Sequence, residues 1–262
     1  MGTVVSFDVI AAFAGQPLAE AVRWLHWVDA TFSPYLSGSE VSRLARGEIS
    51  VTDCAPEVAE VLAACESVTE ASDGYFSARY ADRLDPSGYV KGWAIERAAA
   101  MLAAVGSDSH CVNGGGDVQC VGPRSAAAMA AVNEPVGETI DPPPGEPWRI
   151  GIADPARPGS LIRVVTGYGF AVATSGIAER GPHIIDPHTG RPADEFLSVT
   201  VVGPSLALAD AYATAAVAMG AAARDWVEAL DGYCGFAVRT DGTCWQTNGF
   251  ADHVAAGADG AI

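Results

Sequence analysis

Basic residues are scarce in this chain. The 262 residues include 15 Lys and Arg against 32 Asp and Glu, which gives a formal net charge of −17. A surface of that sign repels phosphate backbones, so we expect no nucleic-acid partner. The acidity favours solubility and identifies no substrate by itself.

Long apolar runs are also missing. Hydrophobic residues make up 49% of the chain, yet a membrane-spanning helix needs about 20 consecutive apolar residues. The longest candidate, 206–219, is interrupted by Asp210 and Thr214. Met1 is followed by a strand-like alternation without the basic region of a secretory signal. We therefore predict no membrane span and a cytoplasmic location, unless a leader has been removed.

The six cysteines lack the spacing of a metal site. No CxxC pair and no zinc-like histidine spacing occurs among them, so we interpret them mainly as small buried hydrophobic residues. A bridge between Cys234 and Cys244 across a hairpin is a weaker alternative. The glycine run 114–116 fits neither GxGxxG nor the Walker pattern, which argues against a dinucleotide-binding fold of those types.

Strand and helix patterns do not alternate strictly along the chain. This favours an α+β fold, a mixed and largely antiparallel sheet with packed helices, over a doubly wound sheet. We expect one domain over 1–250, with a mobile acidic, Pro/Ala-rich loop at about 124–147 and a flexible tail at 251–262. Helices are predicted at 17–30, 56–69, 92–104 and 206–219. Strands are predicted at 3–10, 111–113, 118–121, 148–153, 161–165, 170–174, 197–202, 235–238 and 243–247.

The predicted helix 206–219 carries one carboxylate among apolar residues. Asp210 and Thr214 are four positions apart and so share a helix face. A buried carboxylate needs a partner because burying its charge alone is costly. Carboxylate and hydroxyl oxygens are suitable ligands for Mg²⁺. The alternative is that Asp210 pairs with an arginine and Thr214 bonds back to its own helix.

Three further segments combine turn formers with reactive side chains. Between Asp85 and Gly92, Gly88 allows a backbone carbonyl to approach a ligand and Lys91 can reach a phosphate, although a helix-capping turn would use the same residues. The glycine run 114–116 also suits close backbone approach. The segment His183–Pro192 holds a histidine, a carboxylate, a hydroxyl and a guanidinium on a rigid loop. A tight surface turn is the alternative for that loop.

Together these segments resemble the ApbE family, the FAD:protein FMN transferases. The matching pieces occur in family order over residues 1 to about 220. They are Met-Gly-Thr at 1–3, Ser-Glu-Val-Ser-Arg-Leu at 39–44, Asp-Gly-Tyr-Phe-Ser at 73–77, Asp-Pro-Ser-Gly-Tyr-Val-Lys-Gly at 85–92, Val-Asn-Gly-Gly-Gly-Asp at 112–117, Ala-Thr-Ser-Gly at 173–176, His-Ile-Ile-Asp-Pro-His-Thr-Gly-Arg-Pro at 183–192, Ser-Val-Thr-Val-Val at 198–202 and Ala-Asp-Ala-Tyr-Ala-Thr at 209–214.

The resemblance implies a Mg²⁺-dependent enzyme that cleaves FAD, attaches FMN through its phosphate to a Thr or Ser of an acceptor protein, and releases AMP. Its metal ligands would be Asp210, Thr214 and a carbonyl from Gly88. His183 would lie beside the pyrophosphate as general base, and with Asp210 it forms the catalytic pair. The residues matching the FAD site are Met1, Tyr35, Glu40, Tyr75, Phe76, Ser77, Asp85, Lys91 and His183.

Two departures from the family pattern and two alternatives go with this resemblance. Ser77 stands where the family commonly has Asp, and Gly114 stands where Ala is usual. The same site with water as nucleophile would make an FAD pyrophosphatase that releases FMN and AMP. A site that binds without turnover would make a non-catalytic FAD-binding protein, although Asp210, Thr214 and His183 argue against it.

Overall fold

The computed structural model describes residues 2–10, 15–80, 83–124, 145–178 and 181–254. Met1, most of the predicted loop 124–147 and residues 255–262 of the predicted tail lie outside the described residues. The helices are α1 (Gln16–Phe32), α2 (Glu40–Ala45), α3 (Pro56–Ala71), α4 (Ser87–Ala104), α6 (Leu206–Met219) and α7 (Ala223–Glu228), with 3₁₀ turns η1 (Val51–Asp53), η2 (Gly220–Ala222) and η3 (Asn248–His253). The strands are β1 (Val5–Val9), β2 (Arg79–Tyr80), β3 (Arg83–Leu84), β4 (His110–Gly114), β5 (Asp117–Val121), β6 (Trp148–Ala153), β7 (Leu161–Gly167), β8 (Ala171–Ser175), β9 (Ile185–Asp186), β10 (Arg191–Pro192), β11 (Phe196–Gly203), β12 (Cys234–Arg239) and β13 (Cys244–Gln246).

Seven strands form the main sheet in the order β1-β4-β5-β8-β11-β12-β13, and every neighbouring pair is antiparallel. β4–β5 and β12–β13 are hairpins, as expected where antiparallel neighbours follow one another in sequence. β6 and β7 pair separately, as do β2–β3 and β9–β10. The α+β prediction is therefore confirmed, with fully antiparallel strand pairing in the described sheet.

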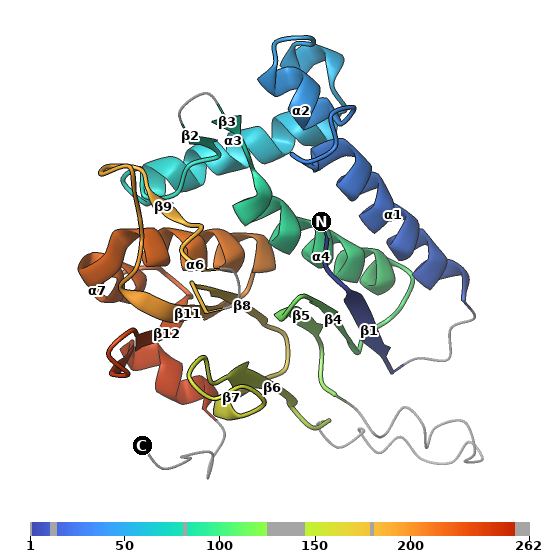
Figure 1. Cartoon of the computed structure of the whole chain (residues 1–262). Helices are drawn as coiled ribbons and strands as arrows, with labels where there is room; N and C mark the ends of the chain where they lie inside the picture. The colour runs from blue at the N-terminus through green and yellow to red at the C-terminus, as the bar shows by residue number, and fades with distance from the viewer. Residues whose placement is uncertain (1, 11–14, 81–82, 125–144, 179–180, 255–262) are drawn as a thin grey trace, which may run out of the picture.

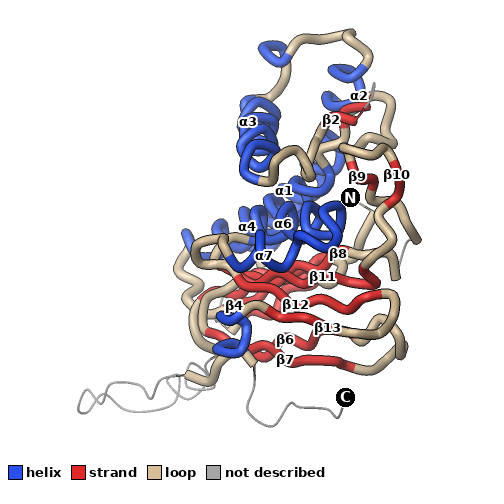
Figure 2. The backbone as a smooth tube through the Cα atoms, turned by 90° about the vertical axis from the view of Figure 1, so that its left-hand side faces the viewer, coloured by secondary structure: helices blue, strands red, loops and turns tan. Residues whose placement is uncertain are grey.

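Different elements cover the two faces of the main sheet: helices lie on one face, and the β6–β7 hairpin lies on the other (Figure 2). Alternate residues of a strand point to opposite faces. Ala173 and Ala237 belong to the cluster that faces α4 and α6, whereas Val172 and Phe236 belong to the cluster beside the β6–β7 hairpin and η3. Both faces of the sheet are therefore buried, each beneath a different cluster.

Helix α6 lies at the centre of the molecule. Ser205 caps its start by accepting a hydrogen bond from the Leu208 N–H, and Gly220 ends it with φ +62°. Ala209, Ala213 and Ala216 pack on the sheet, while Ala211 packs into the outer helical cluster. A helix that is apolar all round is one buried on all sides. In the described residues, Leu206–Glu228 is the helical stretch long and apolar enough to cross a membrane, and here it is largely buried in the core.

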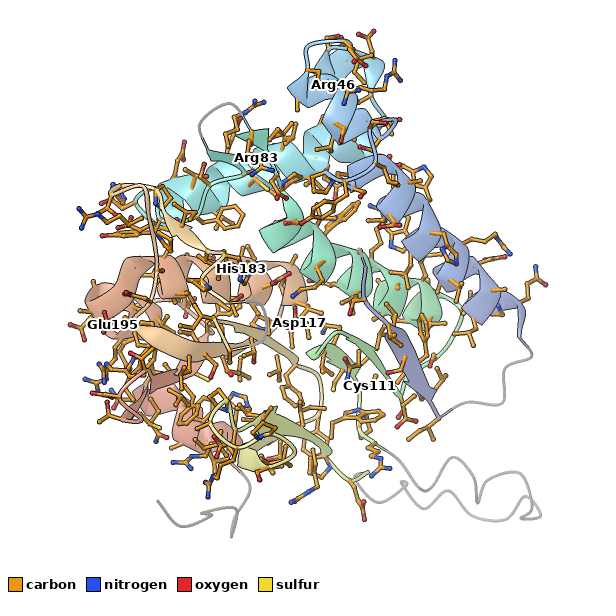
Figure 3. The ribbon with its side chains drawn as sticks, viewed as in Figure 1. Arg46, Arg83, Cys111, Asp117, His183 and Glu195 are labelled. Carbon is orange, nitrogen blue, oxygen red and sulfur yellow. The ribbon has the colours of Figure 1, made fainter. Side chains whose placement is uncertain are left out.

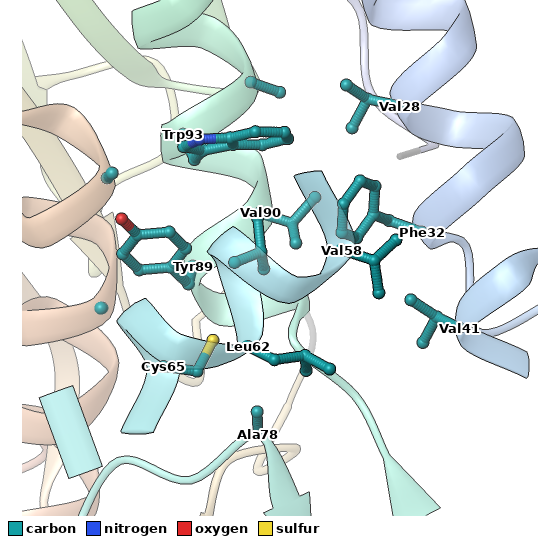
Figure 4. Close-up of a cluster of buried hydrophobic side chains, with 14 of the residues drawn as sticks. Val28, Phe32, Val41, Val58, Leu62, Cys65, Ala78, Tyr89, Val90 and Trp93 are labelled. Atoms are coloured by element: carbon teal, nitrogen blue, oxygen red, sulfur yellow. The ribbon is translucent and has the colours of Figure 1, made fainter. Parts of the chain in front are cut away.

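The outer helices close over α4 and α6 (Figure 1). Val28 and Phe32 from α1, Val58 from α3, and Val90 and Trp93 from α4 share one buried cluster (Figure 4). This second helical layer covers the side of α4 that does not face the sheet. It therefore fixes the position of α4, which carries Lys91.

Several local elements differ from the sequence predictions. The polar segment after α1 contains α2, because Ser39 caps it by accepting the Ser42 N–H. Helix α4 begins at Ser87 rather than residue 92, and α7 was not predicted. Residues 251–254 were assigned to the tail from sequence. Residues 251–253 instead complete η3, beside fully buried Phe250, and Val254 forms a β-bridge with Val165. Cys244 pairs with Val238 in the β12–β13 ladder, so the Cys234–Cys244 alternative is wrong, and both thiols are free.

Candidate active site

A half-buried lysine joins three elements of the fold. Lys91 of α4 places its Nζ 2.5 Å from Oδ2 of Asp117 on β5 and 3.5 Å from Oδ1 of Asp210 on α6. The carboxylate side chains are 1% and 2% exposed, whereas the lysine side chain is 26% exposed. Figure 3 labels Asp117 beside the junction of these elements. Lys91 is therefore the most exposed side chain of this cluster.

Backbone amides hold the remaining carboxylate oxygens. Oδ2 of Asp210 accepts the Gly92 N–H at 3.0 Å, and Oδ1 of Asp117 accepts the Thr174 N–H at 3.0 Å. In a regular α-helix the amide of residue 92 is directed at the carbonyl of residue 88. Here the Gly92 amide donates to the Asp210 side chain, and this bond links the start of α4 directly to α6.

The cluster holds two carboxyl groups and one ammonium. Burial raises the pKa of Asp210, and the neighbouring Asp117 charge adds to that, while Lys91 opposes it. Burial alone would lower the pKa of Lys91, but the charges of Asp210 and Asp117 outweigh it and raise the pKa above its usual range. When both carboxyls are ionised, the cluster has a net negative charge that would stabilise a further cation.

Thr214 lies one helical turn beyond Asp210 and contacts α4. Its Oγ1 is 3.2 Å from Oγ of Ser175 at the end of β8. A Cβ placed on Gly88 would lie 3.4 Å from Oγ1 of Thr214 and 3.3 Å from the ring of Phe76. Gly88 thus lies beside the Thr214 side chain, and the ligand role of its carbonyl stays a prediction. Hard cations such as Mg²⁺ prefer carboxylate, hydroxyl and carbonyl oxygens of this kind.

Among the described residues, no three His, Cys, Asp or Glu side chains gather as a metal site. A cation beside Asp210 would therefore take its other protein ligands from the Thr214 hydroxyl and backbone carbonyls. Magnesium typically keeps its remaining positions for water and phosphate oxygens. The donor set fits an open site for a hard cation better than a closed structural metal.

Two predicted FAD-site segments meet at a histidine. Nε2 of His188 donates to the backbone carbonyl of Asp73 at 2.8 Å, and the His188 ring lies edge-on to Tyr75 with centroids 4.5 Å apart. Phe76, the next residue, is buried against Gly88. The structure therefore joins the segment 73–77 to the loop 183–192, which the sequence separates widely.

His183 lies on the exposed part of the same loop (Figure 3). Its Nδ1 is 2.9 Å from the carbonyl of Gly181, and since a carbonyl only accepts, Nδ1 carries the hydrogen in this bond. Nε2 of the neutral ring then keeps its lone pair. Ile184 packs beneath His183 into the core, and β9 lies beside α6. The loop is thus anchored from below while the imidazole stays accessible.

The other predicted site residues have local roles in this structure. Tyr35 is 91% exposed between α1 and α2. Glu40 accepts the Ala55 N–H at 2.7 Å and so connects α2 to the start of α3. Ser77 bonds within a turn to Arg79, and Asp85 accepts the Ser87 N–H at the start of α4. Met1 lies outside the described residues.

Sequence reasoning missed three residues of the cluster: Asp117, Gly92 and Ser175. Each stands inside a segment singled out above, yet none was assigned a role. An acidic residue directly before the apolar strand 118–121 was the available signal for Asp117, because a carboxylate there becomes buried and needs a cation. The Gly92 amide and the Ser175 hydroxyl gave no comparable signal.

A family model and several named proteins match this chain. The model of the ApbE family matches residues 1–82 and 78–236. The FAD:protein FMN transferase of Rhodobacter capsulatus is 33% identical over 180 residues, which cover 64% of this chain and 30% of that protein. The Vibrio cholerae protein of the same name is 32% identical over 147 residues, which cover 52% of this chain and 39% of that protein. The chain thus spans well under half the length of these relatives.

Solved structures show the same fold over nearly the whole chain. The flavin transferase ApbE from Vibrio cholerae superposes with a TM-score of 0.76 at 21% identity, covering 97% of this chain and 96% of that one. The ApbE protein from Thermotoga maritima gives 0.78 at 21% identity, covering 97% and 96%. Since the family model extends over the segments that carry Lys91, Asp117, His183 and Asp210, this chain belongs to the ApbE family.

Proposed function

We propose that this chain is a Mg²⁺-dependent FAD:protein FMN transferase. The observation that carries the proposal is the placement of Asp210 and Thr214 one turn apart on α6, against Gly88 and beside Lys91. Family membership and the names of the relatives point to the same activity. The substrate would be FAD, and the acceptor a flavoprotein that presents a Thr or Ser hydroxyl.

Asp210, Thr214 and the carbonyl of Gly88 would hold the Mg²⁺ ion. When bound, Mg²⁺ would neutralise the phosphate oxygens of FAD and favour an in-line displacement. Lys91, whose side chain is partly exposed, would add a second positive charge near the same phosphates. Burial of both carboxylates supports this role, because electrostatic interactions strengthen where water is excluded.

FAD would lie across the helical side of the cluster and the loop 183–192. Tyr75 and Phe76 offer aromatic surface next to Gly88, and His188 holds that segment against the loop. The family resemblance adds Met1, Tyr35, Glu40, Ser77 and Asp85 to the residues that would line the flavin site.

His183 would act as the general base. Nδ1 donates to the Gly181 carbonyl, so Nε2 can accept a proton. The acceptor hydroxyl oxygen would bond to the phosphorus of the FMN half, and the bond from that phosphorus to the AMP phosphate oxygen would break. The hydroxyl proton would go to Nε2, and AMP would leave with the electron pair of the broken bond. The exposure of His183 suits a nucleophile that another protein brings.

The test combines a candidate acceptor protein with this chain, FAD and Mg²⁺. Mass spectrometry of the acceptor would show FMN attached at a Thr or Ser, with AMP released in equal amount. Asp210→Asn and chelation of Mg²⁺ should each abolish both products while FAD still binds. AMP release without acceptor, and no labelling when acceptor is added, would identify a pyrophosphatase instead. FAD binding with neither product would identify a flavin-binding protein.

A further inference from the structure

Lys91 is shared unequally between its two carboxylates. Its Nζ is 2.5 Å from Asp117 but 3.5 Å from Asp210, and the longer separation exceeds a normal charge-assisted hydrogen bond. Asp117 is the first residue of β5, inside the sheet between β4 and β8, and the Thr174 N–H fixes its other oxygen. The strand framework therefore sets where the ammonium rests.

We propose that Asp117 is a positioning residue that holds the Lys91 ammonium off Asp210, leaving Oδ1 of Asp210 for the divalent cation. This inference rests on the proposed function, because it concerns the cation site of that function. A cation at Asp210 repels the nearby ammonium. Asp117 gives Lys91 a second anion, so that it stays in place and charged while Asp210 binds the cation.

The alternative geometry follows from removing Asp117. Lys91 would then have Asp210 as its remaining carboxylate in the cluster, and Coulomb attraction would draw the ammonium onto Oδ1. The same oxygen would have to give up an ion pair before it bound a cation. Lys91 would change from a neighbour of the cation site into its competitor.

Direct binding of Mn²⁺ in the absence of FAD tests this role without measuring turnover. Calorimetry would compare the wild-type chain, Asp117→Asn, Lys91→Met and the double variant. Asparagine keeps an oxygen for the Thr174 N–H and so preserves the strand contact. We expect Asp117→Asn to weaken Mn²⁺ binding on the order of tenfold, within the range of coupled sites. Asp117→Glu should restore part of the loss.

The double variant separates action through Lys91 from direct attraction between Asp117 and the cation. If Asp117 acts through Lys91, adding Asp117→Asn to Lys91→Met should change Mn²⁺ affinity far less than it does in the wild type. An equal loss in both backgrounds would overturn the proposal. So would unchanged affinity in Asp117→Asn.

Two controls keep the outcome interpretable. Asp154→Asn removes another buried carboxylate, paired with Arg157 at 2.7 Å and remote from the cluster, and it should leave Mn²⁺ affinity unchanged. Lys91→Met alone should bind Mn²⁺ at least as tightly as the wild type, and a loss there would overturn the proposal even if Asp117→Asn failed to fold. Mn²⁺ binding without FMN transfer would refute the proposed function alone, whereas no Mn²⁺ binding by the wild type would refute both.

Discussion

His183 and His110 each bond to a backbone carbonyl, but in opposite environments. His183 is exposed and uses Nδ1 toward Gly181. His110, at the start of β4, is fully buried, with Nε2 2.9 Å from the Ala99 carbonyl and Nδ1 2.9 Å from the Ser107 hydroxyl. Both ring nitrogens of His110 are therefore engaged, whereas His183 keeps one nitrogen for chemistry. The same side chain is structural in one place and a candidate base in the other.

Replacing His183 by Ala should separate binding from transfer. We expect His183→Ala still to bind FAD and Mg²⁺ and to lose FMN transfer by about 100-fold or more, the lower end of general-base contributions. In-gel flavin fluorescence of the acceptor would measure the loss. His26→Ala, at an exposed position of α1, is the control. Transfer at the wild-type rate by His183→Ala would eliminate the base role.

His110 predicts a dependence of stability on pH. Burial lowers the pKa of His110 below its ordinary value of 6.5, so the unfolded chain binds this proton more readily than the folded one. The resulting stability is present above the unfolded pKa and is lost as pH falls through the folded pKa. Urea unfolding at a series of pH values should show a shallower acid loss for His110→Asn than for the wild type. Equal slopes would mean that His110 is not held neutral.

At the scale of elements, close packing of α4 on α6 determines the site. A Cβ on Gly92 would collide with the backbone carbonyl of Leu206 and lie 2.9 Å from Cβ of Asp210. The missing side chain lets the Gly92 N–H reach the Asp210 carboxylate. Glu96 of α4 also accepts the Ala207 N–H at 2.9 Å and so holds the start of α6. These contacts place Lys91 and Asp210 together.

Alanine at the two glycines of α4 should have unequal effects. Gly92→Ala should cost about 1–3 kcal/mol of unfolding free energy, as overpacking does, and should weaken Mn²⁺ binding because α4 moves off Asp210. Gly88→Ala meets its neighbours only at 3.3–3.5 Å, and alanine gains helix propensity of about 0.5–1 kcal/mol. Its stability should therefore stay near that of the wild type. Chemical denaturation measures both, and an equally stable Gly92→Ala would contradict the packing.

At the scale of the whole molecule, the cysteines report on separate parts of the core. Cys65 lies in the outer helical cluster, and Cys111, Cys120 and Cys234 lie on the sheet face beneath β6–β7. Burial raises the pKa of Cys65 and of Cys234 to about 12. The thiols of Cys65 and Cys234 are therefore inaccessible to reagents and form little thiolate at neutral pH.

Alkylation of the folded protein should therefore divide the six cysteines into a fast-reacting and a slow-reacting group. We expect exposed Cys244 and half-buried Cys54 to react with iodoacetamide first, and the four buried thiols to react only on global unfolding. Peptide mass spectrometry over time would give the individual rates. Reaction of Cys65 well before Cys111 and Cys120 would show instead that the outer helices open independently of the sheet.

Local sequence signals predicted much of the scaffold. Pro56, the Ser205 cap and Gly220 mark helix ends that depend on neighbouring residues only, and the structure confirms them. Alternation predicted most strands of the sheet, but their spatial order and the separation of β6–β7 from it were not predictable. Strand order depends on pairing between distant segments. Short α2, α7 and η3 were missed because tertiary contacts stabilise them more than periodicity does.

The sequence by itself determined the family, the apolar helix with Asp210 and Thr214, and the need of that buried carboxylate for a partner. Only the tertiary structure decided the partner. The partner is Lys91, so the alternative of an arginine is wrong. The Thr214 hydroxyl lies beside the Ser175 hydroxyl at the end of β8. The tertiary structure also decided that Asp117 shares the lysine, because the register of β5 fixes which face each residue takes, and a shift of one residue would turn Asp117 away. These side-chain contacts depend on how separate elements pack, which no local sequence pattern specifies.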